Sequence, residues 1–219
     1  MQVILVRHGE TASNRDRLAL GRKDVPLNSL GLAQAARLGK AIALERAAGT
    51  TFAAVYSSPL VRARQTAEAI ATALGLEVTE APELIEMDVG EMDGLTGAEL
   101  RERHPEFLRS WWGPEAGIVR MPGGESLQEV QDRAWPLIEL VRDTYPAEAA
   151  VIAVSHNFVI RALICRALGI DLADFRRFEV GLASTTRLEF RGPRTLITNL
   201  NDVCHLAGLE TEPEYWPRK

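Results

Sequence analysis

MQVILVRHGETASN, residues 1–14, contains four successive apolar residues, 3–6, that stop abruptly at Arg7-His8-Gly9. A short continuous apolar run bounded by a turn signal is typical of a fully buried strand in a parallel sheet. Open α/β sheets bind ligands at the carboxyl ends of their strands, so Arg7 and His8 fall where an anion site is expected. The simpler alternative is that both residues only begin a surface loop, and three residues alone do not exclude it.

A second stretch repeats this pattern far along the chain. Residues 151–154 (VIAV) are apolar and lead to Ser155-His156, just as residues 3–6 (VILV) lead to Arg7-His8. The chain has only four histidines, so two of them at matching positions are informative. Two buried strands that end at the same edge of a sheet would place both imidazoles in one crevice.

The composition, with 46% hydrophobic and 25% charged residues among 219, indicates an ordinary globular protein. A net charge of −5 argues against nucleic acid and acidic membranes as partners, so an anionic substrate needs a local basic site. Cys165 and Cys204 lack metal-like spacing and are expected to be buried free thiols. The N-terminus has neither a basic leader nor a membrane-length apolar run, so we expect a cytoplasmic protein.

Alternating strand and helix patterns predict the fold class. Strands are expected at residues 3–6, 52–56, 77–79, 150–155, 180–190 and 195–200, with helices between most of them. This alternation is typical of an α/β three-layer sandwich with a mostly parallel central sheet and helices on both faces. We expect a single domain over residues 1–219, with a small inserted helical lid at about 95–122 and a surface tail at the C-terminus.

Arg62 is a candidate ligand for the anion. Ser57-Ser58-Pro59 follows the strand at 52–56 and is typical of a serine cap with proline at the first helical position. Arg62 then falls in the first helical turn, beside backbone N–H groups that favour anions. The alternative is a solvated arginine on an exposed turn, which is disfavoured by the two histidines elsewhere.

Glu86 is a candidate general acid, because it follows the apolar pair Leu84-Ile85. A partly apolar setting raises the pKa of a carboxyl group and suits it to acid catalysis. The alternative is that Glu86 belongs to a solvated face, as most charge runs do.

Residues 105–114 contain Trp111-Trp112 and several turn-forming residues, so an irregular segment is expected there. The tryptophans are interpreted as a lid or substrate flank rather than core. Four arginines lie near them in the sequence: Arg101, Arg103, Arg109 and Arg120.

Taken together, these residues resemble the histidine phosphatase superfamily, in its phosphoglycerate mutase-like branch. The resemblance rests on five motifs in order: RHGET with Asn14; SSPL at 57–60 with Arg62 and QTA at 65–67; Leu84 and Glu86 with Gly90 and Gly94; GGES at 123–126; and Ser155-His156. It runs from residue 3 to about 168, and Asn201 with His205-Leu206 is similar to the end of many members.

The resemblance implies a catalytic role for each candidate. His8 would attack the phosphorus of a phosphomonoester and become a phosphohistidine. Glu86 would protonate the leaving alkoxide and then activate water. Arg7, Arg62 and His156 would hold the phosphoryl oxygens, which these cations neutralise without a metal ion or another cofactor.

Three further residues are expected to contact the substrate by the same resemblance: Asn14, Gly21 and Asn157. Asn157 stands where most members have glycine after the second histidine, so its side chain is expected to influence substrate choice. Leu20 replaces a polar residue that is common in relatives, so one phosphate contact is expected to be missing.

Three functions stay open at this point. Hydrolysis of a small phosphorylated metabolite is favoured, because Glu86 is followed by Met87-Asp88-Val89-Gly90 rather than the Arg-His-Tyr-like stretch of mutases, and only 28 residues separate Gly94 from Gly123. A phosphoglycerate mutase-type transferase is the alternative that the four arginines support. A non-catalytic phospho-ligand or protein-binding module would be indicated by loss of His8 or Glu86, and both are present. The substrate is not named by the sequence, and the oligomeric state, a homodimer included, is left open.

Overall fold

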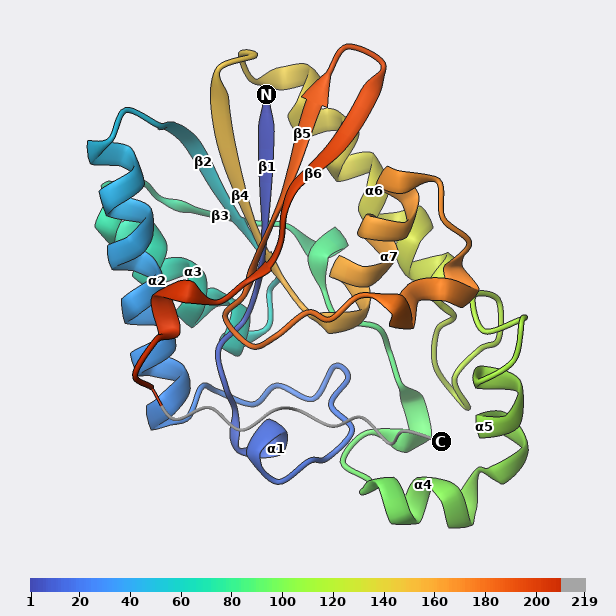
Figure 1. The fold of residues 1–219 in the computed structure, drawn as a ribbon. Helices are drawn as coiled ribbons and strands as arrows, with labels where there is room; N and C mark the ends of the chain where they lie inside the picture. The colour runs from blue at the N-terminus through green and yellow to red at the C-terminus, as the bar shows by residue number, and fades with distance from the viewer. Residues whose placement is uncertain (210–219) are drawn as a thin grey trace.

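Six strands form one central sheet, and helices cover both of its faces (Figure 1). The structure is a computed structural model and describes residues 1–209. The strand order is β3-β2-β4-β1-β5-β6, with parallel pairing from β3 to β1 and antiparallel pairing at β5 and β6. The strands are β1 (Gln2–Arg7), β2 (Thr51–Ser57), β3 (Val78–Glu80), β4 (Ala149–Ser155), β5 (Thr185–Arg191) and β6 (Arg194–Asp202). The predicted α/β class with a mostly parallel sheet is confirmed.

Two pairs of long helices form the outer layers (Figure 1). α2 (Ser29–Ala47) packs with α3 (Val61–Leu74) over one face, and α6 (Leu127–Thr144) packs with α7 (Asn157–Leu168) over the other. Three short helices lie beyond the carboxyl ends of the parallel strands: α1 (Ala12–Arg15), α4 (Gly97–Arg103) and α5 (Pro105–Trp111). Four 3₁₀ turns complete the described elements: Pro82–Leu84, Gly90–Met92, Leu172–Arg177 and Cys204–Leu206.

Strand β1 is buried on both faces, which explains its unbroken apolar run. Ile4 and Val6 pack in the core under α2 and α3, whereas Val3 and Leu5 pack in the core under α6 and α7. Successive side chains of a strand point to opposite faces of the sheet. An apolar residue at every position therefore contributes to the core on both faces. Burial of each such side chain contributes roughly 1.5–3 kcal/mol to folding.

The register between β1 and β4 positions the first polar residues after each strand. The two strands are parallel neighbours, and Arg7 pairs with Ser155. His8 and His156 each follow immediately, so they leave the sheet side by side at its carboxyl edge. The repeated sequence pattern therefore corresponds to two adjacent strands in the same register.

Several predicted boundaries were wrong. The strand expected at 180–190 begins at Thr185, because residues 178–184 form loop and turn, with Ala183 at a φ of 53°. The segment 105–114 contains helix α5, whose first residue Pro105 needs no N–H partner at that position. Trp111 is fully buried in the core cluster, so its assignment to a lid was wrong.

Two other expectations also need correction. Helix α3 begins at Val61 with Leu60 as its cap residue, so no serine side chain caps it and Pro59 precedes the helix. Cys165 is a buried free thiol as predicted, but Cys204 is exposed because it lies in the turn after the edge strand β6. Most of the predicted surface tail, residues 210–219, lies outside the described residues. In the part of the chain that the structure describes, none of the helices has the length and apolar character that crossing a membrane requires.

Candidate active site

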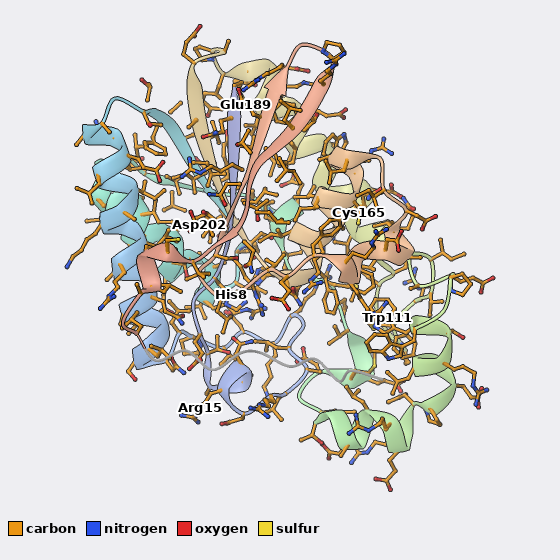
Figure 2. All side chains as sticks on the ribbon, viewed as in Figure 1. His8, Arg15, Trp111, Cys165, Glu189 and Asp202 are labelled. Carbon is orange, nitrogen blue, oxygen red and sulfur yellow. The ribbon has the colours of Figure 1, made fainter. Side chains whose placement is uncertain are left out.

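His8 and His156 lie next to each other at the carboxyl edge of the sheet, with His8 near the middle of the molecule (Figure 2). Their ring centroids are 5.1 Å apart and the ring planes are inclined by 57°. Both side chains are buried, with 3% and 0% exposure respectively. The expectation that two distant segments bring two imidazoles into one crevice is confirmed.

The hydrogen bond of His8 defines which nitrogen can react. Nδ1 lies 2.7 Å from the carbonyl oxygen of Gly9. A carbonyl only accepts, so Nδ1 carries the proton and donates it, and Nε2 keeps its lone pair. Gly9 itself must be glycine because a Cβ there would lie 2.6 Å from the carbonyl oxygen of Gly31 in α2.

His156 is held by a serine that the sequence analysis assigned to a helix cap. The Ser58 hydroxyl accepts from the N–H of Leu60 and lies 2.7 Å from Nε2 of His156. If that hydroxyl donates to Nε2, the proton of the imidazole sits on Nδ1. Nδ1 is buried and has no hydrogen-bond partner among the described residues, so it can serve a bound oxyanion.

The surroundings keep both imidazoles neutral. Burial is the main cause that lowers the pKa of His8 well below 6.5, and the charges of Arg62 and Arg7 add to it. Burial likewise lowers the pKa of His156 well below 6.5, followed by the charge of Arg62. A neutral imidazole is the nucleophilic form of histidine, and His8 is in this form at physiological pH.

We expect NMR titration of the imidazole Cε1 protons to give midpoints below pH 6.5 for both His8 and His156, with His8→Asn and His156→Asn variants to assign the signals. Below pH 6.5 the unfolded chain binds protons at these residues that the folded chain does not bind. The free energy of unfolding should therefore decrease as the pH falls below 6.5. A midpoint at or above 6.5 for either residue would contradict this environment.

Arg62 is fully buried in the first turn of α3, so the alternative of a solvated arginine was wrong. Nη2 donates to the carbonyl oxygen of Gly21 at 2.7 Å, and Nη1 donates to that of Lys23 at 2.9 Å. Burial lowers the pKa of Arg62 to about 10, which still leaves it charged at neutral pH. The loop at residues 21–23 thus fixes the guanidinium without neutralising its charge.

Arg7 is the second buried cation of the cluster. Its Nη1 donates to the carbonyl oxygen of Val180 at 2.7 Å, in the loop that precedes β5. The charges of Arg7 and Arg62 both lower the pKa of His8 and of His156, which places the two guanidinium groups around the imidazole pair.

Glu86 lies against the same cluster and is almost completely buried. Oε1 accepts the N–H of Met87 at 2.7 Å, and Oε2 lies 3.4 Å from the N–H of Phe158 in the first turn of α7. Burial raises the pKa of Glu86 above 4.5, although the hydrogen bond from Met87 and the charge of Arg62 oppose the rise. A raised pKa keeps more of the carboxyl group protonated, as a general acid requires.

A salt-bridge network that the sequence analysis missed holds the backbone of Glu86. Arg22 and Arg133 each donate to the carbonyl oxygen of Glu86 at 3.2 Å. Both arginines also bond Glu125, which accepts the N–H of Asp88 at 3.0 Å. The GGES motif at 123–126 was the available signal, and its carboxylate ties this loop to the candidate acid.

The three residues that were predicted to contact the substrate, Asn14, Gly21 and Asn157, make different interactions in the structure. Asn14 accepts from the N–H and hydroxyl of Thr11 through Oδ1, which fixes the orientation of its side chain. Gly21 acts on Arg62 through its carbonyl oxygen, so it positions a cation. Asn157 accepts from Nε of Arg161 at 2.8 Å and lines a cavity beside the cluster.

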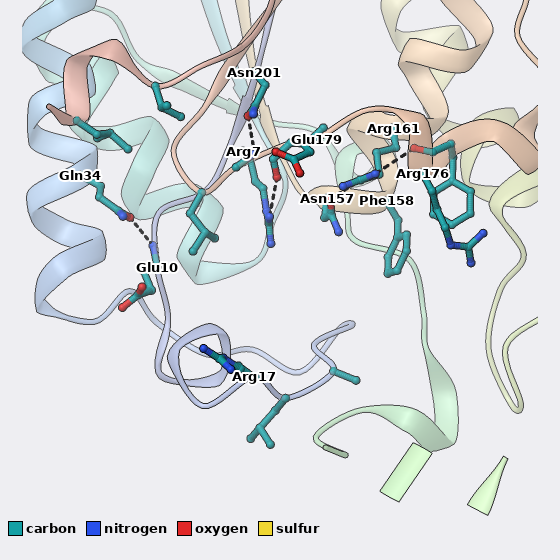
Figure 3. Close-up of a pocket in the computed structure, with 18 of the residues that line it drawn as sticks. Arg7, Glu10, Arg17, Gln34, Asn157, Phe158, Arg161, Arg176, Glu179 and Asn201 are labelled. Carbon is teal, nitrogen blue, oxygen red and sulfur yellow. Dashed lines mark hydrogen bonds between the residues drawn. The ribbon is translucent and has the colours of Figure 1, made fainter. Parts of the chain in front are cut away.

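This cavity has a volume of about 790 Å³, and Arg7 and Asn157, the neighbours of His8 and His156 in the sequence, line it (Figure 3). Its walls come from the first loop, α4, α7, the 3₁₀ turn at Leu172–Arg177, the loop before β5 and the C-terminal turn. Arg7 connects the cavity to the buried cluster, and Leu95, Leu100 and Trp112 form part of its apolar wall. The volume is in the range of small-molecule sites.

Three of the four arginines near the tryptophans pair with carboxylates on the surface. Arg103 bonds Glu99 at 3.3 Å and Arg109 bonds Glu106 at 2.6 Å, and Arg120 pairs with Glu129. None of the four is among the described residues that line the cavity.

The fold and the buried cluster, with its cations and neutral imidazoles at the edge of a parallel sheet, indicate the class of protein as a phosphomonoesterase. The sequence model of the histidine phosphatase superfamily (branch 1) matches residues 3–203. The chain belongs to this family.

Individual relatives carry two kinds of name. Phosphoserine phosphatase 1 of Hydrogenobacter thermophilus is 35% identical over 212 residues, covering 97% of each chain. A probable phosphoglycerate mutase of Salmonella choleraesuis is 32% identical over 212 residues, covering 94% of this chain and 95% of the relative. Among solved structures, a mycobacterial glucosyl-3-phosphoglycerate phosphatase in complex with vanadate superimposes with a TM-score of 0.81 at 27% identity, covering 91% of this chain and 98% of that one.

Proposed function

We propose that the protein is a metal-independent phosphomonoester hydrolase that acts through a phosphohistidine. Nε2 of His8 attacks the phosphorus and forms a P–N bond, while the ester P–O bond breaks and Glu86 gives its proton to the leaving alkoxide. In the second half, the Glu86 carboxylate takes a proton from water and the hydroxide displaces His8. Phosphate leaves, and both residues return to their starting protonation states.

The observation that carries this proposal is the 5.1 Å separation of the two imidazoles among buried cations. Phosphoryl transfer depends mainly on positioning and on neutralising the equatorial oxygens. Arg7, Arg62 and the Nδ1–H of His156 are the donors for these oxygens, and Asn14 adds its amide. His156 faces His8 across the space in which the phosphoryl group would lie.

Hydrolysis is favoured over mutase action by the surroundings of the cluster. A mutase must retain its intermediate and exclude water. The four surface arginines do not supply the additional cations for this, because three are engaged by carboxylates. The names of the relatives include both phosphatases and mutases, so they do not decide between hydrolysis and mutase action. The preference for hydrolysis rests on the cavity, which the four arginines do not line, and on the short segment 95–122.

The substrate class that fits is a small phosphorylated metabolite. Phosphoserine and glucosyl-3-phosphoglycerate are named for two similar proteins, and both molecules carry a carboxylate. We further propose that the protein acts as one domain in the cytoplasm, where free thiols persist. Within it, residues 95–122 cover the substrate, since Leu95, Gly97, Leu100 and Trp112 line the cavity.

The decisive experiment is a screen of phosphomonoesters with and without 2,3-bisphosphoglycerate. We expect release of inorganic phosphate that does not depend on this bisphosphate. Interconversion of phosphoglycerates in its presence, without phosphate release, would show a mutase instead.

EDTA should leave the rate of hydrolysis unchanged. The charges that neutralise the phosphoryl oxygens come from arginines, so chelation removes nothing that the proposed reaction needs. The measurement is phosphate release after dialysis against EDTA, with added Mg²⁺ and Zn²⁺ as controls. Loss of most activity, restored by one of these metals, would contradict the proposal.

A further inference from the structure

Arg176 is held flat between aromatic rings in the 3₁₀ turn Leu172–Arg177. Its Cζ lies 4.1 Å from the ring centroid of Phe175 and 4.2 Å from that of Trp112. Nη2 donates to the carbonyl oxygen of Trp111 at 2.8 Å. The guanidinium is therefore fixed in direction, as is suited to recognition of a planar anion.

The charge of Arg176 is not neutralised by any carboxylate among residues 1–209. Its Nε is buried and has no hydrogen-bond partner in that part of the chain. Burial, and then the like charge of Arg161, lower the pKa of Arg176 to about 10. Arg176 is thus a partly buried cation without a carboxylate partner among the described residues, and such a group is expected where a ligand supplies the opposite charge.

Arg176 shares one cavity with Arg7 of the candidate catalytic cluster. Arg7, Asn157 and Arg176 all line it, and Arg176 lies on the wall remote from Arg7 (Figure 3). Phe158 connects the two regions, because its N–H lies 3.4 Å from Glu86 and its ring lies 6.1 Å from the ring of Phe175. A substrate with its phosphate at the histidines would thus extend its other end toward Arg176.

We propose that Arg176 binds a carboxylate of the substrate and so selects phosphorylated carboxylic acids over phosphate esters that lack a carboxylate. This rests on the proposed hydrolysis. A carboxylate matches the planar fork of a guanidinium, which can donate two parallel hydrogen bonds. Trp112 and Phe175 keep the fork in the orientation that binding requires.

The test compares matched substrates with Arg176→Met. The pairs are 3-phosphoglycerate with glycerol 3-phosphate, and phosphoserine with phosphoethanolamine, which differ in the carboxylate. We expect kcat/KM for the two acids to fall about 50-fold, and for the two partners to change by less than about threefold. Arg177→Met is the control, because the neighbouring Arg177 is exposed and pairs with Asp174.

The ratio within a pair is insensitive to the fraction of folded protein, since misfolding lowers both rates equally. An equal loss for both members of a pair would show that Arg176 only packs, and no loss for either member would also overturn the proposal. Calorimetric binding of 3-phosphoglycerate to His8→Ala, with and without Arg176→Met, gives the same comparison without turnover. If wild-type protein hydrolyses none of these esters, the hydrolase proposal fails, whereas this binding comparison still decides the role of Arg176.

Discussion

His8→Ala is expected to lower kcat/KM for phosphomonoester hydrolysis by about 10⁴-fold or more, a loss typical of a removed nucleophile. The variant lacks the Nε2 lone pair, and His156 is not placed to replace it, because Nε2 of His156 is engaged by the Ser58 hydroxyl. The fold should persist, since the side chain of His8 forms one hydrogen bond, to its neighbour Gly9. Circular dichroism and thermal unfolding check the fold, and phosphate release checks the activity.

His104→Ala is the matched control, because His104 lies at the junction of α4 and α5 and takes no part in the cluster. Its activity should stay within about twofold of wild type. A quench of the wild-type reaction with radiolabelled substrate should trap an acid-labile, base-stable phosphoramidate that His8→Ala cannot form. Full activity of His8→Ala would remove this residue from the role of nucleophile.

The catalytic edge of the sheet was predictable because its determinants are local. The apolar run at 3–6 belongs to a central strand that is buried on both faces. The similar run at 151–154 belongs to the strand beside it, which is buried in the same way. Arg62 could be placed in a first helical turn from the serines and proline before it. The complete burial of Arg62 could not be predicted from the neighbouring sequence, because the loop that covers it, residues 21–23, is distant along the chain.

Residues whose roles depend on long-range contacts escaped the sequence analysis. Ser58 reads locally as a helix cap, yet its hydroxyl bonds a histidine 98 positions away. Trp111 sits in a segment rich in turn formers, but the rings of Phe158 and Phe175 surround it in the core. No local sequence motif marks Arg176. Its proposed role depends on the aromatic rings that pack around it in the fold and on the lack of a carboxylate partner among its described neighbours.

Glu86→Gln should lower kcat for alkyl phosphates by about 10²–10⁴-fold while KM changes little, because general acid–base catalysis is lost and binding is kept. Glutamine preserves the shape and can still accept the N–H of Met87 through its amide oxygen. The exposed Glu83, three residues earlier, supplies the control variant Glu83→Gln, for which wild-type rates are expected.

The leaving group separates the two roles of Glu86. p-Nitrophenolate departs without protonation, so Glu86→Gln should still form the phosphoenzyme from p-nitrophenyl phosphate and release one equivalent in a burst. Slow turnover should follow, because water activation still needs the carboxylate. For alkyl phosphates, wild-type kcat should decrease as the pH rises through the raised pKa of Glu86, and this dependence should disappear in Glu86→Gln. Wild-type kcat with an unchanged pH profile in the variant would assign the acid–base role to another group.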